Sequence, residues 1–176
     1  MLDFPFAFSN RSHYSLWVEN LNDLFGNTIK DTAIDLFFYK PAWGDITVSE
    51  IQFDPTPPVQ LPDQEYLELY NASGLNINLK NWTLSVGNKA LHFPNYILQK
   101  DSFLLVTDSA VLPQFNVQNG IGLNWPSGFL PNSGATVLVL GPDSQLVHLA
   151  EYNVAQYSNP NKANGGWSLE NKSVNK

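Results

Sequence analysis

The sequence contains no cysteine, which excludes a disulfide framework, a thiolate zinc site and a cysteine nucleophile. Basic residues are also scarce, because nine Lys and Arg stand against 16 Asp and Glu and leave a formal net charge of −7. Without a basic excess, binding to nucleic-acid phosphates or to an anionic membrane surface is disfavoured. No apolar run approaches the roughly 20 residues of a membrane-spanning helix, so we expect no membrane insertion within this chain.

Motifs that mark common enzymes and cofactor sites are absent as well. There is no Gly-x-Ser-x-Gly elbow, no phosphate-binding glycine loop, and no EF-hand or calcium-binding repeat. The three histidines, His13, His92 and His148, are far apart in the sequence. His92 and His148 alternate with apolar neighbours, and we interpret these two as solvent-facing strand residues rather than as a shared catalytic or zinc site. We therefore expect no catalytic residues, no metal and no cofactor, and no motif supports a calcium site.

Hydrophobic residues make up 43% of the 176 residues, which is enough for one packed domain and a remnant. Short runs of β-branched, aromatic and leucine residues alternate with Gly, Pro, Asn and Asp, and this pattern predicts strands joined by turns. The candidate strands are 14–19, 33–39, 46–53, 65–70, 76–79, 82–86, 90–93, 103–107, 135–140, 146–152 and 167–170. Their spacing predicts an antiparallel sandwich or barrel, and residues 108–115 are the one candidate for a helical turn.

Alternation within the strands identifies a candidate core. In residues 65–70 it places Glu65 on the core face with Leu67 and Leu69, and Glu68 on the opposite face between two tyrosines. A carboxylate in that position needs hydrogen-bond donors. The residues expected in the core are Ile46, Val48, Ile51, Leu67, Leu69, Trp82, Leu84, Leu104, Val106, Val137, Val139 and Trp167. Ile46 and Val48 have the opposite strand parity to Ile51, so some of these assignments are wrong unless a β-bulge intervenes.

Six short motifs follow one another from residue 45 onward. They are Ile46-Thr-Val-Ser-Glu-Ile51, Glu65-Tyr-Leu-Glu-Leu-Tyr-Asn71, Leu79-Lys-Asn-Trp-Thr-Leu84, Phe103-Leu-Leu-Val106, Gly134-Ala-Thr-Val-Leu-Val-Leu140 and Gly166-Trp-Ser-Leu-Glu170. In this order they resemble the lamin tail domain in its bacterial extracellular form, over residues 45–170. The resemblance implies an immunoglobulin-like β-sandwich, in agreement with the strand pattern. One departure is Ser49, where the family often has Asn before the Glu.

Residues 1–44 differ from the rest of the chain. Segment 14–39 contains two predicted strands around a turn-rich connection, and it resembles the last two strands of a bacterial immunoglobulin-like domain. We interpret 1–44 as the C-terminal remnant of such a domain plus a linker, 45–170 as the lamin-tail-like sandwich, and 171–176 as a flexible tail. An isolated hairpin would leave its aromatic residues exposed. We therefore expect it to dock on 45–170 or to pair with the same hairpin of a second chain, giving a dimer of the fragment.

Two pairs of residues are candidates for a site. Glu50 and Glu68 lie on strands that the resemblance pairs as neighbours, and we interpret them as structural carboxylates, with a calcium site or acid–base catalysis as alternatives. Trp125 and Phe129 lie in a loop rich in Pro and Gly, and exposed aromatic rings there would bind a protein or a glycan. The alternative is that both rings fold back and close one end of the sandwich.

Together these observations predict a non-catalytic structural, adhesion or interaction module of a larger bacterial cell-surface or secreted protein. The resemblance implies a parent protein that is extracellular, periplasmic or associated with the outer membrane, with a protein or glycan as partner. The alternative function is a carbohydrate-binding module attached to a hydrolase, with the Trp125 loop as its binding site.

Overall fold

The computed structural model describes residues 3–174, which divide into two compact units, one ending at Pro41 and the other beginning at Ala42. The sequence placed this boundary after residue 44, a few residues later. Of the predicted tail, 171–176, the last two residues lie outside the described part of the chain.

The first unit is an antiparallel hairpin of β1 (Ser12–Val18) and β2 (Thr32–Phe38), whose ladder has no register shift. In its connection, the Asp23 carboxylate accepts hydrogen bonds from the side-chain amide and the backbone N–H of Asn27, at 2.7 and 2.9 Å. These bonds hold the pKa of Asp23 below its usual value. Every residue of β2 is exposed, and Trp17 on β1 is 66% exposed. The predicted hairpin is confirmed, and its apolar side chains remain largely uncovered.

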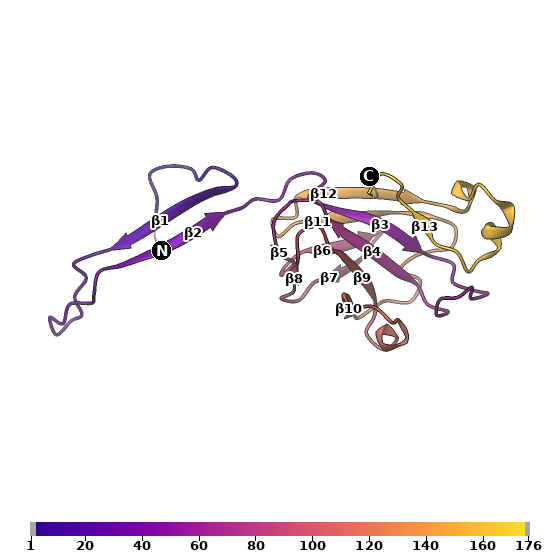
Figure 1. The fold of residues 1–176 in the computed structure, drawn as a ribbon, viewed down its shortest axis with the longest axis horizontal. Coiled ribbons are helices and arrows are strands. Elements are labelled where there is room, and N and C mark those ends of the chain that lie inside the picture. Colours follow the sequence, from indigo (N-terminus) through magenta and orange to yellow (C-terminus); the bar gives the residue numbers. More distant parts are fainter. Residues whose placement is uncertain (1–2, 175–176) are drawn as a thin grey trace. The chain divides into compact units, whose positions relative to one another are not determined.

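The second unit is a β-sandwich of two sheets with the strand orders β10-β9-β4-β3-β13 and β12-β11-β6-β7, together with the two-stranded sheet β5-β8 (Figure 1). The strands are β3 (Ile46–Gln52), β4 (Tyr66–Asn71), β5 (Ile77–Asn78), β6 (Thr83–Val86), β7 (Lys89–His92), β8 (Ile97–Leu98), β9 (Phe103–Asp108), β10 (Gly120–Leu123), β11 (Ala135–Leu140), β12 (Leu146–Tyr152) and β13 (Leu169–Glu170). The predicted all-β sandwich is confirmed. Its pairs are antiparallel except β9–β10, which is parallel.

Helical structure in residues 3–174 is limited to three 3₁₀ helices, η1 (Leu112–Gln114), η2 (Val154–Gln156) and η3 (Pro160–Asn164). The first lies within residues 108–115, where the sequence predicts a single turn. Within the described part of the chain, no helix is long and apolar enough to cross a membrane.

The predicted core is buried with one exception. Ile46, Val48 and Ile51 are 0%, 2% and 5% exposed, and the pairing of β3 with β4 shifts register between Val48 and Glu50. This register shift is a β-bulge, and it resolves the parity conflict because it lets β3 present all three side chains to the core.

Trp167 was predicted in the core, and this prediction is wrong because its side chain is 39% exposed. Its ring lies beneath the Lys162 ammonium, with Nζ 4.2 Å from the ring centroid, and its carbonyl accepts a hydrogen bond from the Tyr157 hydroxyl. The indole covers the side of the η3 segment instead of filling the space between the sheets.

The sequence did not predict β8 and β10. Strand β10 contains Gly120 and Gly122, and glycine is a poor strand former. Glycine is needed at position 122 because a Cβ there would lie only 2.5 Å from Ser109 Cα. This close approach lets the chain after η1 return beside β9 in the parallel orientation.

Candidate functional site

Three carboxylates form a row across the sheet that contains β3. Glu50 on β3 is directly paired with Glu68 on β4 and with Glu170 on β13. The sequence predicted that Glu50 and Glu68 lie close together. It did not predict that Glu170 joins them, because the pairing of β13 with β3 has no local signal in the sequence. Among the described residues, no group of three His, Asp or Glu side chains has the arrangement of a metal site.

Hydroxyl groups satisfy two of these carboxylates. The Tyr66 hydroxyl donates to Glu50 Oε1 at 2.6 Å, and the Ser49 hydroxyl donates to Glu68 Oε1 at 2.7 Å. Tyr66 is itself buried, with its ring 5.5 Å from that of Phe115 in an edge-to-face contact. Each of the two glutamates therefore accepts a short side-chain hydrogen bond from a residue on the neighbouring strand.

The pKa values of Glu68 and of the Tyr66 hydroxyl are both raised by their surroundings. Burial raises the pKa of Glu68, the bond from Ser49 opposes this effect, and the negative charges of Glu50 and Glu170 add to it. Burial also raises the pKa of the Tyr66 hydroxyl, and its bond to Glu50 acts in the same direction. Glu68 is thus a weaker acid than a free glutamate.

The Trp125 loop folds back toward the body of the sandwich. Phe129 is 0% exposed, and its ring packs against that of Trp125 with the centroids 4.8 Å apart and the planes at 67°. Since a buried ring offers no surface to a ligand, the expected binding role of Phe129 is corrected. Trp125 is half-buried, and its indole N–H donates to Glu65 Oε2 at 2.8 Å.

Glu65 anchors this loop, and sequence reasoning missed that role. Its Oε2 also accepts the Leu130 backbone N–H at 3.2 Å. Burial raises the pKa of Glu65, while the bonds from Trp125 and Leu130 lower it. The sequence contained one signal for this anchoring role. Strand alternation places Glu65 on the core face, where a carboxylate needs hydrogen-bond donors.

A hollow of about 510 Å³ lies beside Trp125. Its walls include the side chains of Asp63, Gln64, Glu65 and Asp108. They supply hydrogen-bond acceptors next to an indole ring, a combination that suits a polar ligand with an apolar face.

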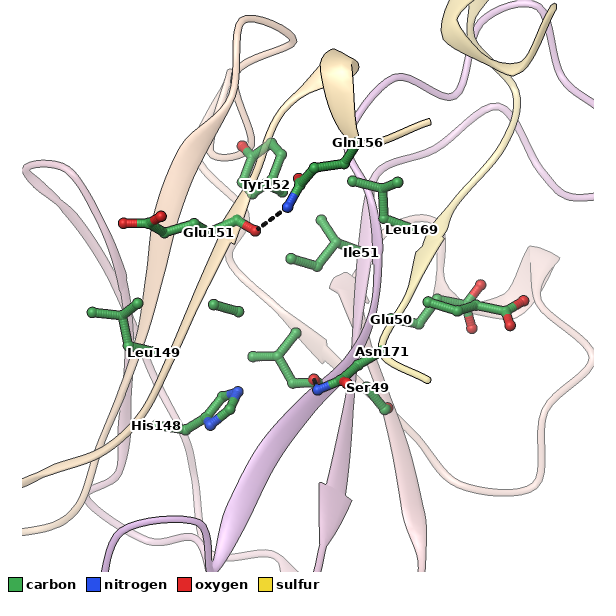
Figure 2. A pocket seen from close by; sticks show the side chains of 13 residues that line it. Ser49, Glu50, Ile51, His148, Leu149, Glu151, Tyr152, Gln156, Leu169 and Asn171 are labelled. Atoms are coloured by element: carbon green, nitrogen blue, oxygen red, sulfur yellow. Dashed lines mark hydrogen bonds between the residues drawn. The ribbon is translucent and has the colours of Figure 1, made fainter. Parts of the chain in front are cut away.

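A groove of about 330 Å³ lies between β12 of one sheet and β3 and β13 of the other (Figure 2). Ile51 and Leu169 extend toward β12 in this view, while the carboxylates of Glu50 and Glu151 point away from the groove in opposite directions. Strands β12 and β13 are the edge strands of their sheets. The groove is therefore the open seam of the sandwich, with an apolar interior and an acidic rim.

The ends of the groove are polar. His148 lies at one end with Ser49 and Asn171, and Gln156 lies at the other (Figure 2). Burial lowers the pKa of His148, which favours the neutral imidazole. Asn171, predicted as the first residue of a flexible tail, donates its backbone N–H to the Ser49 carbonyl at 2.7 Å.

The model of the lamin tail domain family matches residues 40–174. The chain belongs to the lamin tail domain family. A search of curated proteins returned no match to the chain. Family membership gives the sandwich its immunoglobulin-like class and indicates a non-enzymatic interaction module. The family assignment made from the six sequence motifs is confirmed.

The two histidines of this lamin tail domain, His92 and His148, do not lie together. His92 on β7 and His148 on β12 belong to the opposite edge strands of one sheet. His92 is exposed, as predicted, with Nδ1 3.0 Å from the Thr83 hydroxyl. His148 was also expected to face solvent but is half-buried, with its ring 5.8 Å from that of Trp43.

Proposed function

We propose that this lamin tail domain is a non-catalytic interaction module of a larger bacterial cell-surface or secreted protein. The proposal rests on the way its glutamates are used. Glu50, Glu65 and Glu68 each accept a short hydrogen bond from Tyr66, Trp125 or Ser49, and each bond joins separate segments of the sandwich. Carboxylates that hold the fold together in this way are poorly placed to exchange protons with a substrate. The net charge of −7 disfavours nucleic acid as the partner of the module.

The first experiment tests the absence of catalysis. Purified protein is incubated with panels of ester, phosphodiester and glycoside substrates, beside Glu68→Gln and the control Glu151→Gln, which alters an exposed glutamate. We expect the three proteins to be indistinguishable from the buffer. Turnover that is lost in Glu68→Gln, with the circular dichroism spectrum unchanged, would overturn the proposal.

The second experiment tests the interaction function directly. The protein is immobilised and exposed to a displayed library of random peptides and, separately, to a glycan array. Enrichment of related peptides supports a protein-binding module. Recovery of neither peptides nor glycans contradicts an interaction function for this domain.

A carbohydrate-binding function is the second candidate, and the hollow beside Trp125 favours it. Sugar rings stack on aromatic faces, and the carboxylates of Asp63, Glu65 and Asp108 would accept bonds from sugar hydroxyls. Glycan binding that is lost in Trp125→Ala but retained in Trp43→Ala would support it. Trp43 is the matched control because it is 62% exposed elsewhere on the same sandwich. A glycan array without signal would exclude this candidate.

A further inference from the structure

We propose that the groove between β12 and β13 binds an extended peptide segment of a partner protein, which adds as a strand to the free edge of β12. The segment alternates apolar residues that face into the groove with Lys or Arg residues that face its rim. The inference rests on the proposed interaction function and names its site and its class of partner.

The first observation is the free edge of β12. This seven-residue strand is paired with β11 on one side only. On the other side, Val147 O accepts the Gly44 N–H at 2.8 Å, and Glu151 O accepts the Gln156 side-chain amide at 3.2 Å. Leu149 lies between them and shares the backbone orientation of Glu151, two residues further along the strand.

Leu149 therefore directs its N–H and C=O away from β11. None of the backbone bonds described outside the strand ladders involves this residue. An incoming strand can form its hydrogen bonds there, as peptides do when they add to an exposed sheet edge. The two bonds that flank Leu149 fix the limits of the site at Gly44 and Gln156.

The second observation is the apolar interior of the groove. Ile51 and Leu169 are paired across β3 and β13, so both side chains leave the sheet on the same face, toward β12 (Figure 2). Ile51 is 5% exposed, whereas Leu169 is only partly buried. Every second side chain of an added strand would point between the two sheets and contact this surface.

The third observation is the charge of the rim. Glu151 and Glu170 are exposed on the two sides of the groove, and Glu50 is paired with Glu170. No Lys or Arg is among the described residues that line the groove. The remaining side chains of a strand added to β12 would point outward on the same face as Glu151, so basic residues at those positions complement this carboxylate. Glu50 and Glu170 lie on the opposite outer face and add to the negative charge around the groove.

The probe is a fluorescein-labelled pentapeptide in which Lys and Val alternate, which matches the span of β12 between the two flanking bonds, and binding is measured by fluorescence anisotropy at low salt with the full chain. We expect binding that weakens as salt is added, because the rim charges are exposed. Replacing every Lys by Glu should weaken binding about tenfold or more, since the charge complementarity is reversed. Methylating alternate backbone nitrogens of the peptide should also abolish binding, because the donors to β12 are removed.

Protein variants locate the site. Glu151→Lys combined with Glu170→Lys reverses the rim, and we expect it to weaken binding of the Lys peptide by a similar factor. The second substitution also removes the repulsion from Glu50, so the variant should fold. The control is Asp143→Lys, which changes an exposed carboxylate on the turn before β12 that does not line the groove. Amide hydrogen exchange should show new protection of Leu149 in the complex.

The outcomes separate this proposal from the broader function. Failure of the Lys peptide to bind, equal binding by the rim variant, or a complex in which the Leu149 amide stays unprotected would each overturn the β12 site. Protection of Leu149 without peptide, together with a dimer in light scattering, would show that a second copy occupies this edge and would also overturn it. None of these outcomes bears on whether the domain is catalytic. That question is answered separately by the comparison with Glu68→Gln.

Discussion

Replacement of Trp82 by alanine should be among the most destabilising single changes in the sandwich. The side chain is 1% exposed, so nearly all of its ring area is removed from water. A buried tryptophan covers about 150–250 Å². At about 25 cal/mol per Å² this area corresponds to roughly 4–6 kcal/mol. Because the alanine methyl retains part of this area, we expect a loss of about 3–5 kcal/mol, as for other Trp-to-Ala core substitutions.

Tryptophans at graded exposure provide controls on the same sandwich. Trp43 is 62% exposed and Trp167 is 39% exposed, so Trp43→Ala should cost under about 1 kcal/mol and Trp167→Ala an intermediate amount. Urea unfolding followed by circular dichroism measures all three, since that signal does not depend on the tryptophan removed. A loss below about 1 kcal/mol for Trp82→Ala, or equal losses for Trp82→Ala and Trp43→Ala, would refute the burial argument.

Three further changes test other parts of the structure. Burial raises the pKa of Glu68 above its usual 4.5, so the folded state keeps the proton to a higher pH than the unfolded chain, and stability falls as pH rises above about 4.5. The variant Glu68→Gln still accepts the Ser49 bond but does not titrate, so it should flatten this part of the stability–pH curve in urea titrations. Gly166→Ala should lower stability by about 1–3 kcal/mol in thermal melts, because Gly166 has φ +79° and a Cβ would collide with the Pro57 carbonyl, whereas an unchanged melting temperature would contradict this geometry. Removing residues 1–41 should convert an associating protein into a monomer in light scattering, because the exposed apolar hairpin is removed; monomers in both cases would count against hairpin pairing.

Strand positions could be predicted from the sequence because they depend on local patterns. Alternation around Leu67 and Leu69 was sufficient to predict the buried face of β4. The conflicting parity of Ile51 left two possibilities, a wrong core assignment or a bulge, and the structure has the bulge. Strand β10 was missed because its two glycines give no strand signal, and its position depends on the close approach to Ser109.

At the candidate sites, too, local sequence patterns could not predict contacts that depend on how distant segments fold together. The proximity of Glu50 and Glu68 followed from neighbouring strands, but the arrival of Glu170 beside them depends on a contact between segments about 120 residues apart in the chain. Burial of Phe129 and the bond from Trp125 to Glu65 depend on how a loop folds back, which strand patterns do not describe. The groove beside β12 exists only because β12 and β13 are both edge strands, a property of topology and not of any motif.

The register of β13 on β3 has a mechanical consequence. Ile51 is paired with Leu169 and Glu50 with Glu170, so the chain enters β3 and leaves β13 in opposite directions at the same end of this short ladder. Tension applied to the polypeptide on both sides of the sandwich would separate the pairs one after another, instead of shearing them together. Only two residues of β13 resist this peeling, supported by the Asn171 bond to Ser49. Under load, the first segment to detach is therefore one wall of the groove, while the remaining strands of both sheets stay paired.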